Sequence, residues 1–219
     1  MLERKEPSQL IELKLLRFDP HRVVPHIVRS TSYQLKSANA KILAEKSGAL
    51  AVINANYFDE RGRPVGYLAV GEARINAQIS KSDLFTGIFG TRSLVPFIMH
   101  RDEFTPERAD EALQAGPLLF NRGRALEVSR GAGRKSRRAL IGIDDQQRVL
   151  IGVVDSLLGG LTWVELQEIF SAPQRHLQTT DLLNLDGGGS AQLYVNGSQV
   201  KELVSGTTDV PVAIGFFPR

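Results

Sequence analysis

The chain has 219 residues, of which 42% are hydrophobic and 23% are charged, and its formal net charge is +3. This composition is typical of a globular domain with a hydrophobic core of its own. The sequence contains no cysteine, which excludes disulfide bonds, thiolate zinc sites and a catalytic thiol. The small excess of Lys and Arg does not indicate a nucleic-acid partner, because basic residues that bind nucleic acids cluster and alternate with aromatic ones.

Residues 1–7 are charged and are not followed by an apolar segment of the kind found in signal peptides. No apolar run elsewhere has the length needed to cross a bilayer, so we expect no membrane span. The protein is then either cytoplasmic or exported with its signal already removed. The sequence leaves this localisation and the oligomeric state open.

In chain order, the first half of the sequence contains five strand signals and two helix signals. Alternating or short apolar runs predict strands at 11–18, 23–28, 49–53, 68–70 and 94–99. A helical pattern over 38–46 stops at Gly48. A second, short helix is expected to begin at Thr105-Pro106-Glu107 and to end near 114–117.

The second half contains two hairpin signals and one helix start. Apolar runs at 139–143 and 149–154 lie on either side of a polar turn, and runs at 193–195 and 199–203 flank Asn196-Gly197, a strong hairpin-turn pair. Thr162 and Glu165 have the spacing of a capping box, which predicts that a helix begins there. Further strands are expected over 182–185 and 210–217.

The expected strands outnumber the expected helices, and several are joined by hairpins instead of helices. We therefore predict an α+β fold with mixed, mostly antiparallel sheets and a few helices, and not a doubly wound parallel sheet. No low-complexity linker or repeat divides the chain, so residues 1–219 are interpreted as a single domain with a core at about 10–217.

The segment from Asn184 to Ser190 has the most specific chemistry in the sequence. Consecutive glycines at a strand end leave amide groups uncovered, so Gly187, Gly188 and Gly189 could form an anion-binding nest. Asp186 would act there as a base or an electrostatic stabiliser, with Ser190 among the binding groups. Taken alone, the same pattern also fits a tight turn in which Asp186 caps its own backbone.

A second polar segment follows the strand predicted over 49–53. The amides of Asn54 and Asn56, the carboxylate of Asp59 and the rings of Tyr57 and Phe58 suit the recognition of sugar hydroxyls and sugar faces. The alternative is an asparagine-rich turn with both rings in the core.

Most of the basic residues between 122 and 138 are expected on a solvated loop. Arg138 differs because it directly precedes a predicted strand, which gives its side chain a fixed direction for holding a phosphate. The four histidines are scattered, so we expect no histidine-built metal site and no required cofactor. Asp186 and Asp59 could share a divalent cation, but their spacing does not demand one.

Five segments, in the same order, resemble those of the phosphodiester glycosidase family. They are 51–58 (AVINANYF), 114–117 (QAGP), 138–142 (RALIG), 160–162 (GLT) and 184–196 (NLDGGGSAQLYVN). The resemblance extends over roughly residues 10–217. Ala55 and Asn56 stand where the family has two glycines, and Ala139 where it has threonine, so the identity of the substrate is left open.

The resemblance implies hydrolysis of a sugar 1-phosphodiester, or a related glycosidic bond, with release of free sugar. Asp186, Arg138 and Asn54 are then the expected catalytic residues, with Asp186 as base or stabiliser and Arg138 and the glycine loop on the phosphate. Substrate binding is expected of Asn56, Asp59, Gln114, Asn184, Gly187, Gly188, Gly189 and Ser190. Two alternatives remain: a non-catalytic carbohydrate-binding protein of envelope or exopolysaccharide assembly, and a phosphoesterase that breaks the P–O bond.

Overall fold

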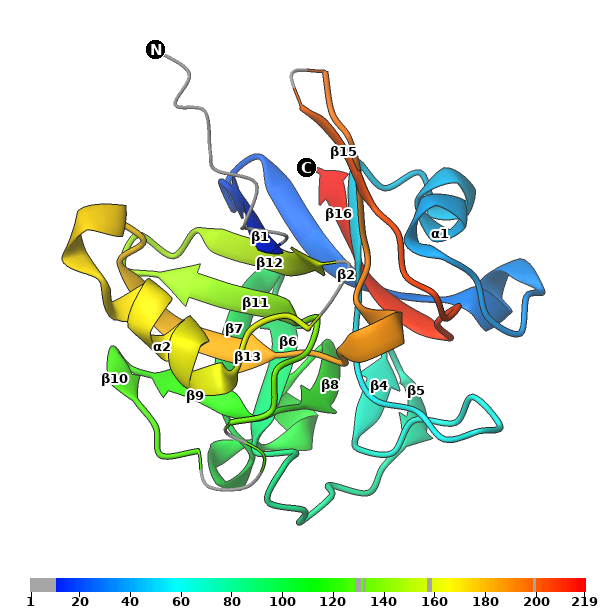
Figure 1. Ribbon diagram of the computed structural model, residues 1–219. Helices are drawn as coiled ribbons and strands as arrows, with labels where there is room; N and C mark the ends of the chain where they lie inside the picture. The colour runs from blue at the N-terminus through cyan, green and yellow to red at the C-terminus, as the bar shows by residue number, and fades with distance from the viewer. Residues whose placement is uncertain (1–10, 129–130, 132, 157–158, 199) are drawn as a thin grey trace.

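The computed structural model describes residues 11–128, 131, 133–156, 159–198 and 200–219. Within them, the strands form three sheets in which every pairing is antiparallel, and two α-helices pack against these sheets (Figure 1). The expected α+β fold with mostly antiparallel sheets is confirmed.

The three sheets share no strand. The six-stranded sheet has the order β1 (Ile11–Phe18), β12 (Val149–Ser156), β11 (Ala139–Asp144), β13 (Thr179–Asn184), β9 (Leu118–Asn121) and β10 (Arg124–Ala125). One five-stranded sheet has the order β15 (Lys201–Val204), β14 (Leu193–Asn196), β3 (Ala51–Asn54), β16 (Val212–Pro218) and β2 (Val23–Arg29). The other has the order β5 (Ala73–Asn76), β4 (Leu68–Val70), β8 (Glu111–Ala115), β6 (Gly87–Arg92) and β7 (Val95–His100).

Both α-helices begin at side-chain caps that the sequence encodes locally. Asn39 accepts a hydrogen bond from the Ile42 amide at the start of α1 (Ala40–Ser47), and the helix ends at Gly48 in the left-handed conformation. Thr162 and Glu165 form the expected capping box of α2 (Trp163–Ser171). Short 3₁₀ helices are found at Ser30–Tyr33, Arg101–Glu103, Pro106–Arg108, Pro173–Arg175 and Gly188–Ser190.

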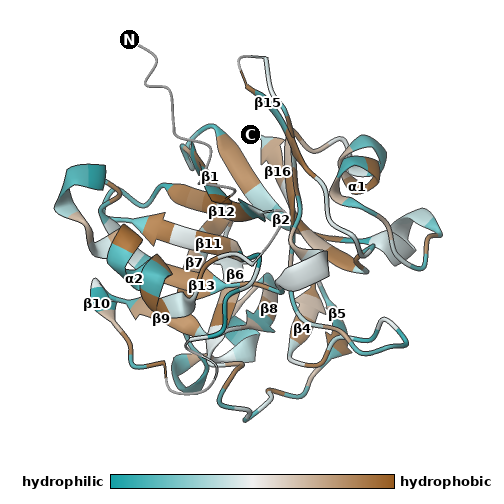
Figure 2. Ribbon diagram, viewed as in Figure 1, coloured by the Kyte–Doolittle hydropathy of each residue, from teal (hydrophilic) through white to brown (hydrophobic). Residues whose placement is uncertain are grey.

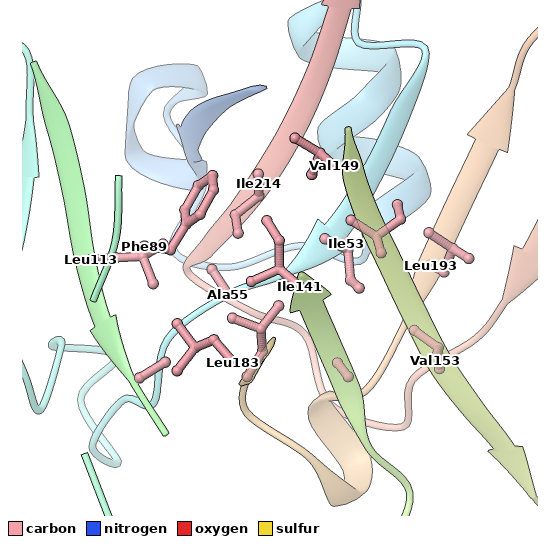
Figure 3. Packing of buried hydrophobic residues seen from close by; sticks show 14 of the residues in the cluster. Ile53, Ala55, Phe89, Leu113, Ile141, Val149, Val153, Leu183, Leu193 and Ile214 are labelled. Carbon is pink, nitrogen blue, oxygen red and sulfur yellow. The ribbon is translucent and has the colours of Figure 1, made fainter. Parts of the chain in front are cut away.

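The main hydrophobic core lies where the three sheets face one another. Ile53 and Ile214 come from one five-stranded sheet, Phe89 from the other, and Ile141 and Leu183 from the six-stranded sheet (Figure 3). Figure 2 shows the same distribution, with the hydrophobic residues along the strands and the hydrophilic ones mainly in the loops. Each fully buried side chain of this size contributes about 1.5–3 kcal/mol, so the three sheets stabilise one another.

The structure departs from the sequence-based expectations between β5 and β10. The helix expected from Thr105 is wrong: a single 3₁₀ turn at Pro106–Arg108 is followed by β8, which pairs with β4 on one side and β6 on the other. Pairing along both edges outweighs a local helix-start signal. Strand β6 was not expected, because Gly87 and Gly90 interrupt its hydrophobic pattern. In the structure close packing requires a glycine at position 90, because a Cβ there would lie 2.5 Å from the Glu111 carbonyl oxygen.

Gly116, between β8 and β9, allows a close contact that supports the loop before β6. A Cβ atom there would overlap the Leu84 carbonyl oxygen and lie 2.9 Å from the Thr86 amide nitrogen. Gly116→Ala is therefore expected to lower the free energy of unfolding by about 1–3 kcal/mol through overpacking. Gly133→Ala is the matched control, because no atom lies within 4 Å of its added Cβ. Urea denaturation that gave the same stability for both variants would contradict the expectation.

Candidate active site

A pocket of about 370 Å³ lies beside the carboxyl end of β13 and the amino ends of β11 and α2. Its walls come from segments that are distant in the sequence. The lining residues are Tyr57, Leu84, Gly131, Arg134, Ser136, Arg138, Trp163, Asp186, Gly187 and Gly188. We call this cavity the main pocket; it contains four of the residues expected from the sequence, namely Asp186, Arg138, Gly187 and Gly188.

Asp186 is held at the pocket by its own main chain. Its amide donates to the Ala55 carbonyl oxygen at 2.9 Å, and its carbonyl oxygen accepts a 2.7 Å hydrogen bond from the Asn54 side chain. Burial raises the pKa of the Asp186 carboxyl to about 6, although hydrogen bonds from Ser190 and the Gly187 amide act in the opposite direction. A carboxyl with this pKa changes its charge close to neutral pH, as a general base requires.

The glycine loop lies at the pocket and is closely packed. The Gly187 amide donates to Asp186 Oδ1 at 2.9 Å, and the Gly188 amide donates to the Arg137 carbonyl oxygen at 2.9 Å. A Cβ at Gly187 would lie 2.7 Å from the Arg137 carbonyl oxygen. Because two of the three glycine amides already have acceptors within the protein, positive charge for an anionic ligand has to come from side chains.

Arg138 supplies such a charge. Its side chain is buried, with Nε donating to the Leu161 carbonyl oxygen at 3.1 Å and Nη2 to the Arg134 carbonyl oxygen at 2.5 Å. The guanidinium carbon lies 4.7 Å from the centre of the Trp163 ring, a cation–π arrangement. Burial lowers the pKa of this guanidinium, and no carboxylate of the described residues forms an ion pair with Arg138 or with the neighbouring Arg134.

Tyr57 and Trp163 form aromatic walls of the main pocket. The Tyr57 hydroxyl donates to the Gly116 carbonyl oxygen at 3.0 Å and accepts from Asn184 Nδ2 at 3.1 Å. Burial raises the pKa of Tyr57 well above its ordinary value, so this hydroxyl stays protonated. The sequence already indicated an aromatic binding role for Tyr57. Nothing in the local sequence pattern indicated Trp163, Leu84 or Ser136, which the tertiary fold brings to the pocket.

The amide nitrogens of the three asparagines near Asp186 donate to the protein itself, whereas Asn56 Oδ1 and Asn184 Oδ1 have no hydrogen-bond partner among the described residues. Asn54 is fully buried: its Nδ2 donates to the Asp186 carbonyl oxygen and its Oδ1 accepts from the Gln192 amide at 3.0 Å. Asn184 Nδ2 donates to Tyr57 Oη and to two carbonyl oxygens, and Asn56 Nδ2 donates to the Tyr57 carbonyl oxygen. Their side chains therefore hold the walls of the main pocket in place.

The remaining expected residues lie outside the pocket lining. Gln114 is buried and bonds Ser80 and Phe85, so it anchors the loop that carries Leu84. Asp59 accepts hydrogen bonds from the amide and side chain of Arg63, four residues further on in its own turn. Gly189 is packed against Thr207 and Thr208, and Ser190 bonds the Asp186 side chain.

One comparison shows to which family the chain belongs. The family model for phosphodiester glycosidase (NAGPA) matches residues 47–217, which is most of the chain. The chain belongs to the phosphodiester glycosidase family. This is a family of hydrolases, and the resemblance inferred from the five sequence segments is confirmed. No curated protein sequence matches the chain.

Two solved structures share the fold of this family member. One is the catalytic domain of zebrafish N-acetylglucosamine-1-phosphodiester alpha-N-acetylglucosaminidase, auto-inhibited by its pro-peptide, with 15% identity and a TM-score of 0.67 over 98% of this chain and 86% of that one. The other is a hypothetical protein from Synechocystis, with 14% identity and a TM-score of 0.68 over 95% of this chain. This chain spans 59% of the Synechocystis chain. At such identities the similarity shows a common fold.

Two further observations concern the described part of the chain. It contains no helix that is long and apolar enough to cross a membrane. Its His, Asp and Glu side chains form no group of three or more that could hold a metal ion.

Asp186→Asn is expected to alter the pH dependence of stability between about pH 4 and pH 6. The pKa of Asp186 is about 6 in the folded protein, against an ordinary value of 3.8, so the folded state binds more protons in this range. The free energy of unfolding of the wild type therefore falls as the pH rises from 4 to 6, by up to about 3 kcal/mol from this group. The Asp186→Asn variant should not show this decrease in the free energy of unfolding.

Asp59→Asn is the matched control, because hydrogen bonds from Arg63 lower the pKa of Asp59. The stability that Asp59 contributes is lost as the pH falls through its folded pKa, which is the opposite direction. Urea unfolding of the wild type and both variants at several pH values measures these slopes. A difference between Asp186→Asn and wild type that did not change with pH would contradict the raised pKa.

Proposed function

We propose that the protein hydrolyses the C1–O bond of a sugar 1-phosphodiester and releases the free sugar and a phosphate monoester. One observation supports this most: the main pocket combines Asp186, whose pKa is raised to about 6, with the buried guanidinium of Arg138, which has no ion-pair partner in the described chain. Membership of the phosphodiester glycosidase family supports the same class of reaction.

The charge balance of the main pocket suits a phosphate leaving group. Among the described residues that line it, Asp186 is the one carboxylate. Most glycosidases need a second carboxyl group as an acid, because an alkoxide is a poor leaving group. A phosphate monoester leaves as a stabilised anion, so a fixed cation can replace the acid, and Arg138 and Arg134 provide one.

The proposed reaction divides between these two sides of the pocket. Water attacks the anomeric carbon while ionised Asp186 accepts its proton or stabilises the positive charge that develops on the sugar. The electron pair of the C1–O bond leaves with the phosphate oxygen, next to Arg138. Tyr57 and Trp163 contact the sugar or its phosphate as aromatic walls that exclude water.

The buried amides act on the substrate through the residues that they position. Asn54 sets the place of Asp186 through the main chain, at 2.7 Å from its carbonyl oxygen. Asn184 fixes the Tyr57 hydroxyl, and Gln114 fixes the loop that carries Leu84. Replacing any of them would displace a wall of the pocket by disrupting buried hydrogen bonds.

Asp186→Asn is expected to lower kcat by about 100-fold to 10,000-fold, the usual contribution of a general base. The measurement is the release of free sugar from a panel of sugar 1-phosphodiesters, including nucleotide sugars and an N-acetylglucosamine-1-phospho-methylmannoside. Because the pKa of Asp186 is about 6, wild-type kcat/KM should fall as the pH drops below that value. Asp59→Asn serves as the control and should stay within about twofold of wild type, since exposed sites tolerate such changes.

Water labelled with ¹⁸O tests which bond is broken. The label should appear in the released sugar; label in the phosphate would instead support the P–O cleavage of a phosphoesterase. A near-normal kcat for Asp186→Asn would contradict its role as base. Binding of substrates without any release of sugar would favour a carbohydrate-binding protein.

Arg138→Ala is expected to reduce kcat/KM on phosphodiesters by about 100-fold to 1,000-fold, as for the loss of one group that stabilises developing charge. The loss on neutral aryl glycosides should be much smaller, because they carry no phosphate. Arg137→Ala is a matched control, since Arg137 bonds the Ser205 carbonyl oxygen and does not line the main pocket. Equal losses on both substrate types would mean that Arg138 has a structural role.

A further inference from the structure

A second, smaller cavity of about 110 Å³ adjoins the main pocket; we call it the side pocket. Leu84 and Trp163 line both cavities, so the two are neighbours across these two side chains. The other residues of the side pocket are Asp83, Thr86, His100, Pro117, Leu118, Leu126, Glu127 and Val128.

The two cavities carry opposite charges that do not neutralise each other. Arg134 and Arg138 line the main pocket, and no carboxylate of the described chain forms an ion pair with either. Asp83 and Glu127 are exposed residues at the side pocket and also have no cationic partner among the described residues, whereas the His100 ring lies 3.4 Å from Asp102. The cleft therefore has a cationic end and an anionic end on either side of Trp163.

The place of Arg138 fixes the direction in which a phosphodiester would lie. Its guanidinium is 4.7 Å from the Trp163 ring centre, at the boundary between the two cavities. A sugar whose anomeric carbon is near Asp186 and whose phosphate is near Arg138 has its other ester arm at Trp163. That arm, the aglycone, then continues into the side pocket.

The size of the side pocket limits this arm. At about 110 Å³, the side pocket is less than a third of the size of the main pocket, which has about 370 Å³. A chain of a few heavy atoms fits this space, and Leu118, Leu126 and Val128 provide apolar contact for its methylene groups.

From size and charge together, we infer that the side pocket selects a short aglycone that ends in an ammonium group, as in a sugar 1-(2-aminoethyl) phosphodiester. This inference rests on the proposed function and adds a substrate class to it. The phosphate of such a substrate is anionic and its arm is cationic, which matches the charges of the two cavities. C1–O hydrolysis would release free sugar and 2-aminoethyl phosphate.

Binding of the two phosphate monoesters tests the inference without turnover. Isothermal titration calorimetry compares 2-aminoethyl phosphate with n-propyl phosphate, which has the same arm length without the charge. We expect the amine to bind about 5-fold to 20-fold more tightly, since each exposed ion pair contributes up to about fivefold. Equal affinities in the wild type would overturn the inference.

The variants Asp83→Asn and Glu127→Gln identify the source of the preference. Together they should bring the affinity ratio of the two monoesters close to one, and high salt should reduce it in the wild type. Glu60→Gln is the control for net charge, because Glu60 is exposed and lies outside both cavities; it should leave the ratio unchanged. A ratio that persists in the double variant would overturn the inference.

Turnover separates this inference from the proposed function. The wild type should have a higher kcat/KM for a sugar 1-(2-aminoethyl) phosphodiester than for the matching propyl or methylmannosyl diester, and the double variant should lose this preference. Sugar release with equal kcat/KM for all three diesters would overturn the side-pocket inference and leave the proposed function intact. Preferential binding of the amine with no sugar release from any diester would overturn the proposed function and support the side pocket.

Discussion

The buried side chain of Asn54 joins two sheets at the point where the chain leaves each of them. Asn54 is the last residue of β3 in one sheet; its side chain donates to the Asp186 carbonyl oxygen just beyond β13 in another sheet and accepts from the Gln192 amide ahead of β14. The Asp186 amide returns a hydrogen bond to Ala55. With water excluded, each of these polar groups depends on its partner, so the place of the carboxylate is set by the docking of the sheets.

This arrangement keeps two ionisable groups buried, although the charged form of each is more stable in water. Burial acts against the ionised forms of both Asp186 and Arg138, and neither has an ion-pair partner in the described chain. Such a site lowers stability unless the surrounding fold compensates for it. The hydrophobic core between the three sheets provides this compensation.

The parts of the fold whose contacts lie between residues close in the sequence could be predicted, such as the β11–β12 hairpin and the helix cap at Thr162. Strands β6 and β8 could not, because their identity depends on partners brought together by the whole sheet. The same division holds for the site. Asp186 and Arg138 stand out locally, whereas the inward direction of Asn54 and Gln114 depends on backbone groups far away in the sequence.

Trp163 is the one tryptophan of the chain, and it forms the wall shared by the two cavities. Indole emission responds to the charge and polarity around the ring, and here an unpaired guanidinium lies over one face. The tryptophan fluorescence of the protein therefore originates at the boundary between the two cavities. Occupancy of either cavity can be followed optically in the unlabelled protein.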